Sequence, residues 1–347
     1  MQRMGSRMLR LAKSSLRKLT YLAHPIGLLV EVALFQLRLS RNSSKFLITT
    51  FLVLGGLPGT LLSKLVGKKR SSFEAIGSTS LILEDAIIDN VELRANGFSL
   101  VESAISKTTA DKLLSLALTT KGSNRGMDSG KGYQADIFFN RENPDTVRFD
   151  VDSNELFKNH IVQELACDPR VLKIAQDYLG TLPVLDFVAM WWHTKSPAPD
   201  KEAAQYFHFD MERLRWIKFF FYLTDVNEES GPHVFVPKSH LDNGLPFSLR
   251  SKGYTRLEDS QVDKVFPSAS WKIFTGPIGS MIVEDTRGLH KGKHVENGDR
   301  LVFQLQFTSS LFGKTIDKIQ VNQGDIGNTL KLAMQEFPLT FQQIAVN

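Results

Sequence analysis

The stretch that decides the fold is residues 206–210, Tyr-Phe-His-Phe-Asp, where phenylalanine alternates with polar side chains. In a β-strand, residues two apart point to the same face, so we expect the side chains of His208 and Asp210 to lie together. Residues 285–292, Asp-Thr-Arg-Gly-Leu-His-Lys-Gly, supply a third candidate, His290, in a glycine-containing turn before another strand. Two histidines and one carboxylate match the facial triad of non-haem iron(II) oxygenases, which leaves coordination positions open.

The next predicted strand carries a candidate anion-binding residue, Arg300. Residues 300–307 read Arg-Leu-Val-Phe-Gln-Leu-Gln-Phe, with hydrophobic side chains at the odd positions. This alternation predicts that Arg300 shares a face with Val302 and Gln304. A guanidinium group that faces the inside of a barrel needs a partner, because an unpaired buried charge is costly. A bound dicarboxylate would supply that partner through a bidentate pair.

Outward from these stretches, the chain changes from helical to short strand-like patterns at about Gly180. Helical periodicity covers residues 104–118, 154–179 and 328–335. Aromatic and β-branched runs, separated by glycine, proline, asparagine and aspartate, predict strands at 184–193, 205–210, 216–223, 233–236, 271–274, 279–284 and 300–307. This order predicts a mainly β fold with packing helices, in which an antiparallel barrel or jelly roll forms the centre.

Three pieces of this region together resemble the phytanoyl-CoA dioxygenase family, within the Fe(II)/2-oxoglutarate-dependent oxygenase superfamily. They are 208–210, His-Phe-Asp; 229–240, Glu-Ser-Gly-Pro-His-Val-Phe-Val-Pro-Lys-Ser-His; and 285–292, followed by Arg300. The resemblance extends over roughly residues 93–311. It implies a double-stranded β-helix, the cupin-like jelly roll, with its core at about residues 184–310.

The resemblance also implies a chemistry and a set of site residues. Fe(II) would be bound by His208, Asp210 and His290, and Arg300 would bind the distal carboxylate of 2-oxoglutarate. With O2 as the other cosubstrate, the expected reaction is hydroxylation of an unactivated C–H bond, with release of succinate and CO2. The carboxylate of Asp210 favours hydroxylation over halogenation, because halogenating relatives have a small residue there. The alternative is a jelly-roll protein that binds a ligand without catalysis.

Three further residues are expected to line the cosubstrate pocket by the same resemblance: Met190, Trp192 and Phe220. Two positions depart from the family pattern. Lys238 stands where the turn usually has glycine, and Gly292 stands where some members place a hydroxyl group. These departures concern the geometry of a loop and the affinity for the cosubstrate, and they leave the candidate metal ligands intact.

Other histidines and arginines near these pieces have less specific interpretations. His233 and His240 are candidates for additional ligands, but a backbone-bonding role in the turn is favoured for His240. His193 and His294 are interpreted as surface residues or as neighbours of the site. Arg213 and Arg215 could bind an anionic group of the substrate, or they could belong to a solvated or salt-bridged loop.

The N-terminal 70 residues differ in charge from the remainder of the chain. They contain 13 of the 42 Lys and Arg residues but only one of the 37 Asp and Glu residues, so the remainder is mildly acidic. A mildly acidic globular part argues against binding to nucleic acid. We place an N-terminal helical extension at residues 1–80 and the oxygenase domain at residues 81–347.

Two segments of the extension could contact a membrane. Residues 1–19 predict a basic amphipathic helix. The 18 uncharged residues Phe46–Ser63 reach spanning length, but Gly55, Gly56 and Pro58 interrupt them. We therefore predict peripheral membrane contact through residues 1–70. The alternatives are helices that pack on the domain and an organelle transit peptide.

The single cysteine indicates in which compartment the protein resides. The single cysteine, Cys167, forms no intrachain disulfide, which favours a reducing compartment, the cytoplasm, with possible association with its membranes. The expected partner is a small-molecule or lipid-linked substrate.

Overall fold

The computed structural model describes residues 31–34, 42–77, 80–125, 133–253 and 255–347. The helices are α3 (Ser43–Leu54), α4 (Leu57–Val66), α5 (Asn90–Asn96), α6 (Lys107–Thr119), α7 (Ser153–Phe157), α8 (His160–Ala166), α9 (Pro169–Leu179), α10 (Phe247–Arg250), α11 (Asp259–Asp263) and α12 (Asn328–Glu336). The strands are β1 (Phe98–Val101), β2 (Gly122–Arg125), β3 (Ala135–Ile137), β4 (Arg148–Val151), β5 (Val184–Thr194), β6 (Trp216–Tyr222), β7 (His233–Phe235), β8 (Lys272–Phe274), β9 (Met281–Glu284), β10 (His290–Gly292), β11 (Asp299–Thr308), β12 (Ile319–Val321) and β13 (Ile344–Val346).

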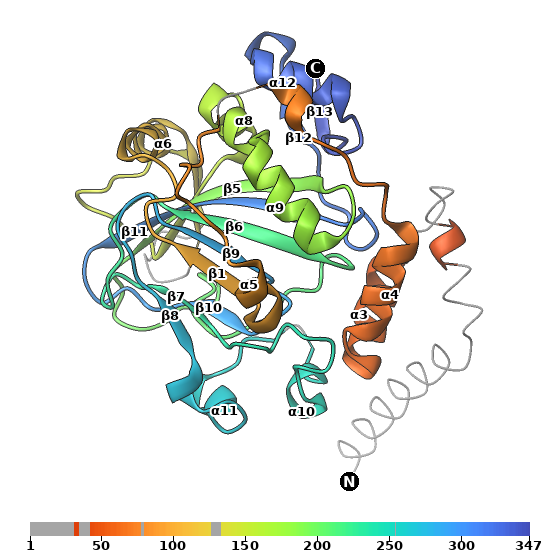
Figure 1. Cartoon of the computed structure of the whole chain (residues 1–347). Coiled ribbons are helices and arrows are strands. Elements are labelled where there is room, and N and C mark those ends of the chain that lie inside the picture. The colour runs from red at the N-terminus through yellow and green to blue at the C-terminus, as the bar shows by residue number, and fades with distance from the viewer. Residues whose placement is uncertain (1–30, 35–41, 78–79, 126–132, 254) are drawn as a thin grey trace, which may run out of the picture.

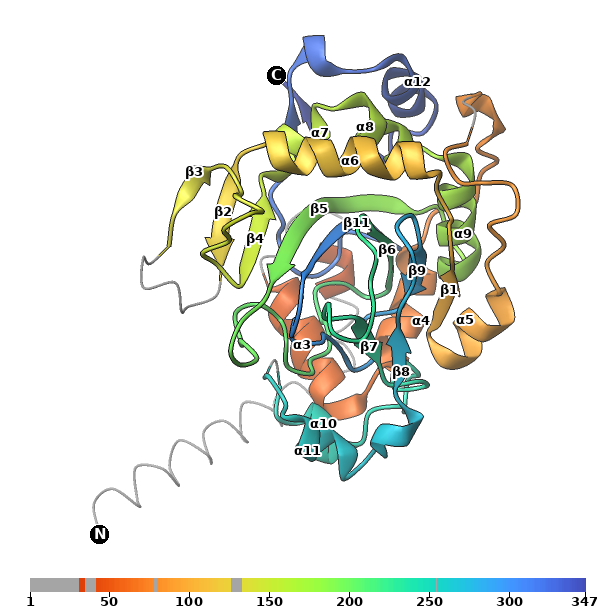
Figure 2. The same cartoon turned by 90° about the vertical axis from the view of Figure 1, so that its left-hand side faces the viewer.

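Two antiparallel sheets form the centre of the molecule (Figures 1 and 2). The larger has the strand order β1-β9-β6-β11-β5-β4-β2-β3, and the smaller has the order β10-β7-β8. From β5 to β11 the chain passes repeatedly between the two, because β5, β6, β9 and β11 belong to the larger sheet, whereas β7, β8 and β10 belong to the smaller. This is the winding of a double-stranded β-helix, and the predicted mainly β jelly-roll fold is confirmed.

The larger sheet has an apolar outer face and a mixed inner face. On β11, Leu301, Phe303 and Leu305 point outward into a core that they share with the helices. Figure 2 shows α6, α7 and α8 along this side of the sheet. The intervening residues of β11 point between the two sheets. Alternation along β11 therefore separates the packing face from the face that holds polar side chains.

The helical pattern at residues 154–179 forms three helices, α7, α8 and α9, instead of one. The side chain of Asn159 accepts a hydrogen bond from Ile161 N at the start of α8, and that of Asp168 accepts one from Arg170 N at the start of α9. Such caps satisfy backbone N–H groups that a helix start leaves without partners. Pro169 lies in the first turn of α9, where it requires no amide hydrogen.

The uncharged run Phe46–Ser63 folds back on itself as the hairpin of α3 and α4. The turn at Gly55 has a φ of 78°, and a Cβ atom on Gly56 would lie 2.8 Å from the carboxylate of Asp242. Both glycines are therefore required for this close approach. Within the described residues, no helix has the length and apolarity to cross a membrane. The helix expected at residues 1–19 lies outside the described residues.

Candidate metal centre

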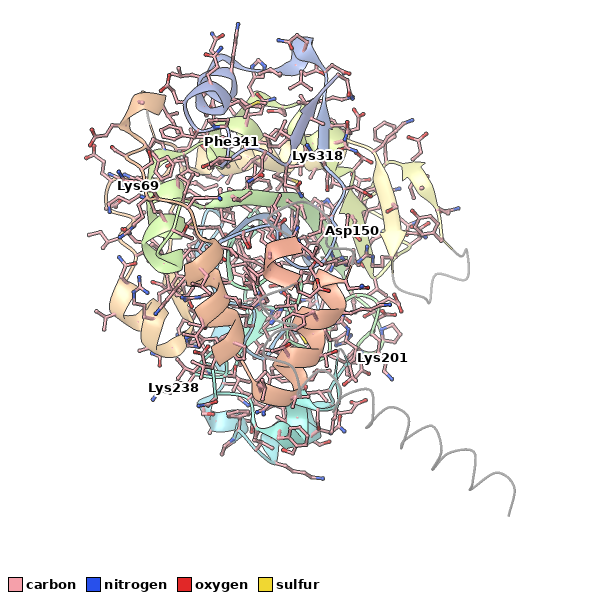
Figure 3. All side chains as sticks on the ribbon, turned by 90° about the vertical axis from the view of Figure 1, so that its right-hand side faces the viewer. Lys69, Asp150, Lys201, Lys238, Lys318 and Phe341 are labelled. Carbon is pink, nitrogen blue, oxygen red and sulfur yellow. The ribbon has the colours of Figure 1, made fainter. Side chains whose placement is uncertain are left out.

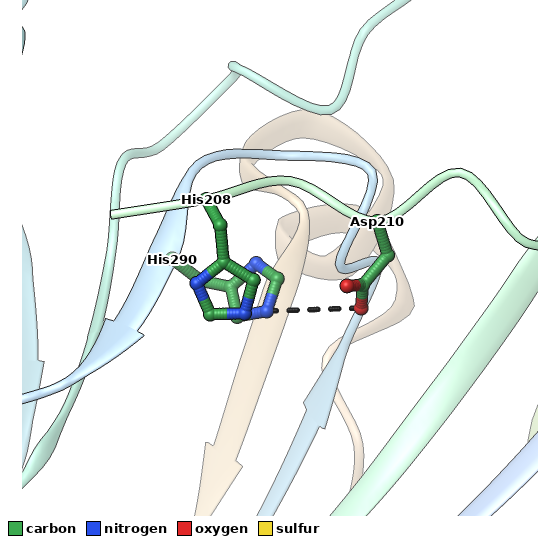
Figure 4. Close-up of side chains that lie close together, drawn as sticks. All are labelled: His208, Asp210 and His290. Atoms are coloured by element: carbon green, nitrogen blue, oxygen red, sulfur yellow. Dashed lines mark ion pairs between the residues drawn. The ribbon is translucent and has the colours of Figure 1, made fainter. Parts of the chain in front are cut away.

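Three candidate ligands from two segments meet between the sheets (Figure 4). His208 pairs through its backbone with His290, since each N–H donates to the carbonyl oxygen of the other at 2.9–3.0 Å. Asp210 N donates to Thr286 O at 2.9 Å. The expected strand at 205–210 is reduced to isolated bridges, but this pairing still brings the three side chains together. Their ligand atoms lie within 4.8 Å of one another, and all three residues are buried.

Hydrogen bonds to the backbone orient both imidazole rings. His208 Nδ1 lies 3.0 Å from Tyr206 O, and His290 Nδ1 lies 2.9 Å from Gly288 O. Because a carbonyl oxygen only accepts, each Nδ1 donates and each Nε2 keeps its lone pair for a ligand. Burial, with the neighbouring imidazole of His290, holds the pKa of His208 well below its usual range. Both features favour the neutral imidazole that binds metal ions.

A buried lysine accompanies the carboxylate of Asp210. Lys218 Nζ donates to Asp210 Oδ2 at 2.6 Å, and His290 Nε2 lies 3.7 Å from the same oxygen. Burial alone would raise the pKa of Asp210, but the charge of Lys218 and the two imidazoles lower it below its usual range. Asp210 is therefore an ionised carboxylate at neutral pH. A carboxylate oxygen has more than one lone pair, so Asp210 can accept from Lys218 and still serve as a metal ligand.

Arg300 is a buried cation, and no carboxylate of a described residue forms an ion pair with it. Its guanidinium group donates to Gly231 O and lies 2.6 Å from His193 Nδ1, while its Nε has no hydrogen-bond partner among the described residues. Burial lowers the pKa of Arg300 to about 10, so the group is charged at neutral pH. A charge in this state requires an anionic ligand to offset its desolvation.

Two more buried donors without described partners lie on the same inner face. They are Gln304 Nε2, two residues along β11 from Val302, and Trp191 Nε1, which is opposite Val302 on β5. With Arg300, they give the region three kinds of N–H donor. An acceptor-rich ligand such as a dicarboxylate fits this set of groups.

Gly292 connects this donor set to the candidate metal site. A Cβ atom on Gly292 would lie 2.6 Å from Arg300 Nη2, so the guanidinium group lies against β10 at this residue. Gly292 and His290 share a face of β10 and are about 7 Å apart along the strand, at roughly 3.3 Å per residue. A short dicarboxylate can span this separation. The glycine that departs from the family pattern therefore makes room for Arg300.

Lys238, the other departure, has a φ of 68°. This is the left-handed region that costs an L-residue about 1 kcal/mol and glycine almost nothing. The backbone thus keeps the conformation for which glycine is the usual residue, and the lysine side chain is exposed there.

Of the three expected pocket residues, the structure brings only Phe220 to the inner face. The Phe220 ring lies 5.0 Å from the ring of His233. Met190 and Trp192 lie on the outer face, opposite Phe303 and Leu301, and pack among the helices. The prediction that Met190 and Trp192 line the pocket is therefore wrong. Trp191, which lies between them on β5, occupies the inner face instead.

The remaining histidines and arginine have structural partners. His240 Nε2 bonds Arg94 O at 3.2 Å, as favoured from the sequence. His193 is buried beside Arg300 and is not a surface residue. His294 Nε2 bonds Ser196 O. Arg213 forms a buried ion pair with Asp186, which supports the salt-bridged interpretation.

Lys218 and Glu284 are inner-face residues that the sequence analysis missed. They lie directly opposite each other on β6 and β9, and Glu284 Oε1 is 3.0 Å from His233 Nε2. Burial raises the pKa of Glu284 to about 8, and burial with the charge of Arg300 lowers that of His233 to about 3. Glu284 is therefore protonated at neutral pH and donates to a neutral imidazole. The sequence signal that could have revealed them is a single charged residue within each of two otherwise apolar strands.

We expect the metal-free Glu284→Gln variant to gain stability relative to the metal-free wild type as the pH rises. The unfolded glutamate loses its proton near pH 4.5, whereas the folded one keeps it to about pH 8. In this window the folded state holds one more proton, so the stability of the wild type falls as the pH rises. Glutamine keeps a donor for His233 but does not titrate.

Urea unfolding at pH 5.5, 7 and 8.5 measures this effect. The free energy of unfolding of Glu284→Gln, relative to wild type, should increase across the series. The surface variant Glu102→Gln serves as the control. A constant difference between Glu284→Gln and the wild type would contradict the raised pKa.

Comparison with known proteins gives a family match. The model of the family described as phytanoyl-CoA dioxygenase (PhyH) matches residues 93–298, which is more than half of the chain. This segment contains the three candidate ligands and ends two residues before Arg300. No curated protein matches the chain.

Similar solved structures include three proteins, each with a TM-score below 0.5. The α-ketoglutarate-dependent epimerase SnoN from nogalamycin biosynthesis is 19% identical, with a TM-score of 0.47 over 63% of this chain and 80% of its own. EvdO2 from Micromonospora carbonacea var. aurantiaca, complexed with 2-oxoglutarate, is 19% identical, with a TM-score of 0.46 over 67% and 94%. HygX from Streptomyces hygroscopicus, with nickel and 2-oxoglutarate bound, is 16% identical, with a TM-score of 0.46 over 71% and 94%.

Proposed function

The chain belongs to the phytanoyl-CoA dioxygenase family, and from this premise we propose that it is an Fe(II)- and 2-oxoglutarate-dependent dioxygenase. The reaction is the hydroxylation of an unactivated C–H bond in a small organic or lipid-linked substrate, with release of succinate and CO2. Bound Fe(II) and 2-oxoglutarate supply, with O2, the oxidising power for this step. The proposed location is the cytoplasm, with peripheral membrane contact through residues 1–70.

The observation that supports the proposal most strongly is the set of three ligand atoms within 4.8 Å of one another. At the other end of β10 from His290 lies the buried Arg300, which forms no ion pair with a described residue. His208, Asp210 and His290 would hold the metal ion. Arg300 would bind the distal carboxylate of 2-oxoglutarate, because its charge has no described anionic partner. The buried setting limits the access of water to the reacting groups.

The side chains around the triad have positioning roles in this proposal. Lys218 would hold the carboxylate of Asp210 in an ionised state and in a fixed position beside the metal ion. The backbone carbonyls of Tyr206 and Gly288 would hold the two imidazole rings in the tautomer that ligates through Nε2.

Turnover of 2-oxoglutarate tests the proposal. Purified protein loaded with Fe(II) should consume O2 and release succinate from 2-oxoglutarate, including some uncoupled turnover before a substrate is known. Tight binding of 2-oxoglutarate without any succinate would favour the second candidate, a ligand-binding jelly-roll protein without catalytic activity.

We expect Arg300→Met to raise the KM for 2-oxoglutarate about 10–100-fold. A hydrogen bond to a charged group contributes about 1.5–3 kcal/mol, which corresponds to this range. Arg300→Lys keeps the charge but loses the fork geometry, so it should have an intermediate KM.

Arg125→Met is the matched control, since this arginine lies outside the barrel and pairs with Asp150 on the surface. The measurement is succinate release as a function of 2-oxoglutarate concentration. An unchanged KM in folded Arg300→Met would remove Arg300 from the cosubstrate site.

A further inference from the structure

Helix α4 has apolar side chains on two faces, but only one of these faces packs on the protein. Leu62 and Val66 point inward, where they contact Leu214 and Phe312. The other face carries three leucines at four-residue spacing, Leu57, Leu61 and Leu65, which are 50%, 53% and 70% exposed. The apolar surface of α4 is therefore wider than the part that packs on the protein, and the row of leucines lies open to a further contact.

The exposed face continues past the turn of the hairpin. Leu54, the last residue of α3, is 49% exposed. With the three leucines of α4, it forms what we call the leucine face: Leu54, Leu57, Leu61 and Leu65. Isolated exposed leucines are ordinary on protein surfaces, but a row of four on one hairpin indicates an interaction site.

Cations accompany the leucine face. Lys64 lies on α4 between Leu61 and Leu65, and Lys68 and Lys69 follow the helix; all three are exposed and form no ion pair with a described residue. Between residues 43 and 73 the sequence contains five Lys or Arg residues and no Asp or Glu. Figure 3 views the molecule from this side, with the hairpin in the foreground and Lys69 labelled.

We propose that the leucine face docks on the surface of an anionic lipid membrane. Exposed leucines that enter the boundary between headgroups and acyl chains, flanked by lysines at the level of the headgroups, match the known physics of interfacial helices. The combination of apolar side chains with unpaired cations favours this occupant over an apolar protein surface, which would leave the lysines buried without partners. The hairpin lies on the surface and does not span the bilayer.

The leucine face belongs to the same hairpin that covers the metal segment. From α3, Phe51 packs against Phe209, the residue between His208 and Asp210, with 5.7 Å between ring centroids. A small, mainly apolar cavity lies between the hairpin and the barrel, lined by Phe51 and Leu62 on one side and by Asp210 and Trp216 on the other. Docking would therefore hold the candidate site close to the lipid surface. This inference rests on the proposed function, and it narrows the substrate class to an amphiphilic molecule that resides in the membrane.

Co-sedimentation with lipid vesicles tests the docking without requiring metal or turnover. The full chain is mixed with vesicles of phosphatidylcholine alone or of phosphatidylcholine with about one third phosphatidylserine. We expect the wild type to sediment with the anionic vesicles, with an affinity that decreases at high salt. The triple variant Leu57→Ser/Leu61→Ser/Leu65→Ser should bind them at least 10-fold more weakly.

The matched control removes apolar surface elsewhere. Ile87→Ser/Val91→Ser replaces side chains that are 78% and 79% exposed outside the hairpin, and it should bind as the wild type does. Circular dichroism and the thermal midpoint show whether each variant is folded; exposed leucines should be replaceable without a large loss of stability.

Three outcomes would overturn the proposal. The wild type could remain in the supernatant with anionic vesicles. The triple variant could sediment as the wild type does, which would assign attachment to another part of the chain, such as residues 1–42. Gel filtration could show a dimer that the triple variant dissociates, which would assign the leucine face to self-association. Since vesicle binding is measured on metal-free protein, its failure is distinguishable from failure of the proposed oxygenase activity.

Discussion

Replacing His208 with alanine should abolish stoichiometric binding of Fe(II) and lower succinate release from 2-oxoglutarate by at least about 1000-fold. Loss of a group that only orients a metal ligand costs about 10–100-fold in affinity or activity, and loss of a ligand itself should exceed this. The remaining pair, Asp210 and His290, offers too few ligand atoms to hold iron against solvent. The side chain of His208 makes one described hydrogen bond, to Tyr206 O, and one ring contact, with His290, so the fold should persist without it.

Iron content after desalting and succinate release are the two readouts for this variant. His294→Ala is the matched control, because His294 bonds the backbone at Ser196 and lies outside the ligand group. It should retain iron and turnover. If folded His208→Ala bound Fe(II) as tightly as the wild type, the triad assignment would be incorrect.

Asp186→Ala should reduce the free energy of unfolding by about 3–5 kcal/mol, the usual cost of leaving one partner of a buried ion pair alone. Arg213 donates to both carboxylate oxygens of Asp186, at 2.9 and 2.6 Å, and Gln306 donates to one of them at 2.8 Å. Both charged side chains are almost completely buried, at 1% and 0% exposure. The loss of Asp186 would strand the guanidinium group of Arg213.

Equilibrium unfolding in urea measures this loss. Asp177→Ala is a matched control, because Asp177 pairs with Arg70 and Lys173 at the surface, where such pairs contribute at most about 1 kcal/mol. The double variant Asp186→Leu/Arg213→Met should recover much of the stability. A loss below about 1 kcal/mol in Asp186→Ala would contradict the buried pair.

The meeting of His208 and Asp210 was predictable from the sequence because it depends on local geometry, whereas His290 was added on the triad pattern and the family resemblance. His208 and Asp210 are two residues apart, and alternation places them together even though the segment forms only isolated bridges. The same rule placed Arg300 on the inner face, since apolar residues mark the other face of β11. Where alternation is clear, sequence determines side-chain direction.

The resemblance misplaced the pocket residues of β5, and alternation could not correct it because both faces of this strand are buried. Met190, Trp191 and Trp192 are all large and apolar, so the pattern does not distinguish the inner face from the outer. The neighbouring strands resolve the direction, because Trp191 is paired with Val302 on β11. The inner-face roles of Lys218 and Glu284 likewise depend on cross-strand pairing, which local sequence does not contain.

The N-terminal hairpin shows another limit of hydrophobic patterns. The length of the run Phe46–Ser63 was compatible with a membrane segment or a packed helix. The structure shows a hairpin with one face on the barrel and the leucine face outside. Burial of one face depends on Leu214 and Phe312, which are distant in sequence.

The most direct test of the oxygenase assignment is an anaerobic titration of metal-free wild type with Fe(II) and then 2-oxoglutarate. A 2-oxo acid that chelates Fe(II) in an open triad gives a visible metal-to-ligand charge-transfer band. The assignment predicts a saturable band at one iron and one 2-oxoglutarate per chain. No band in folded, iron-loaded protein would contradict it.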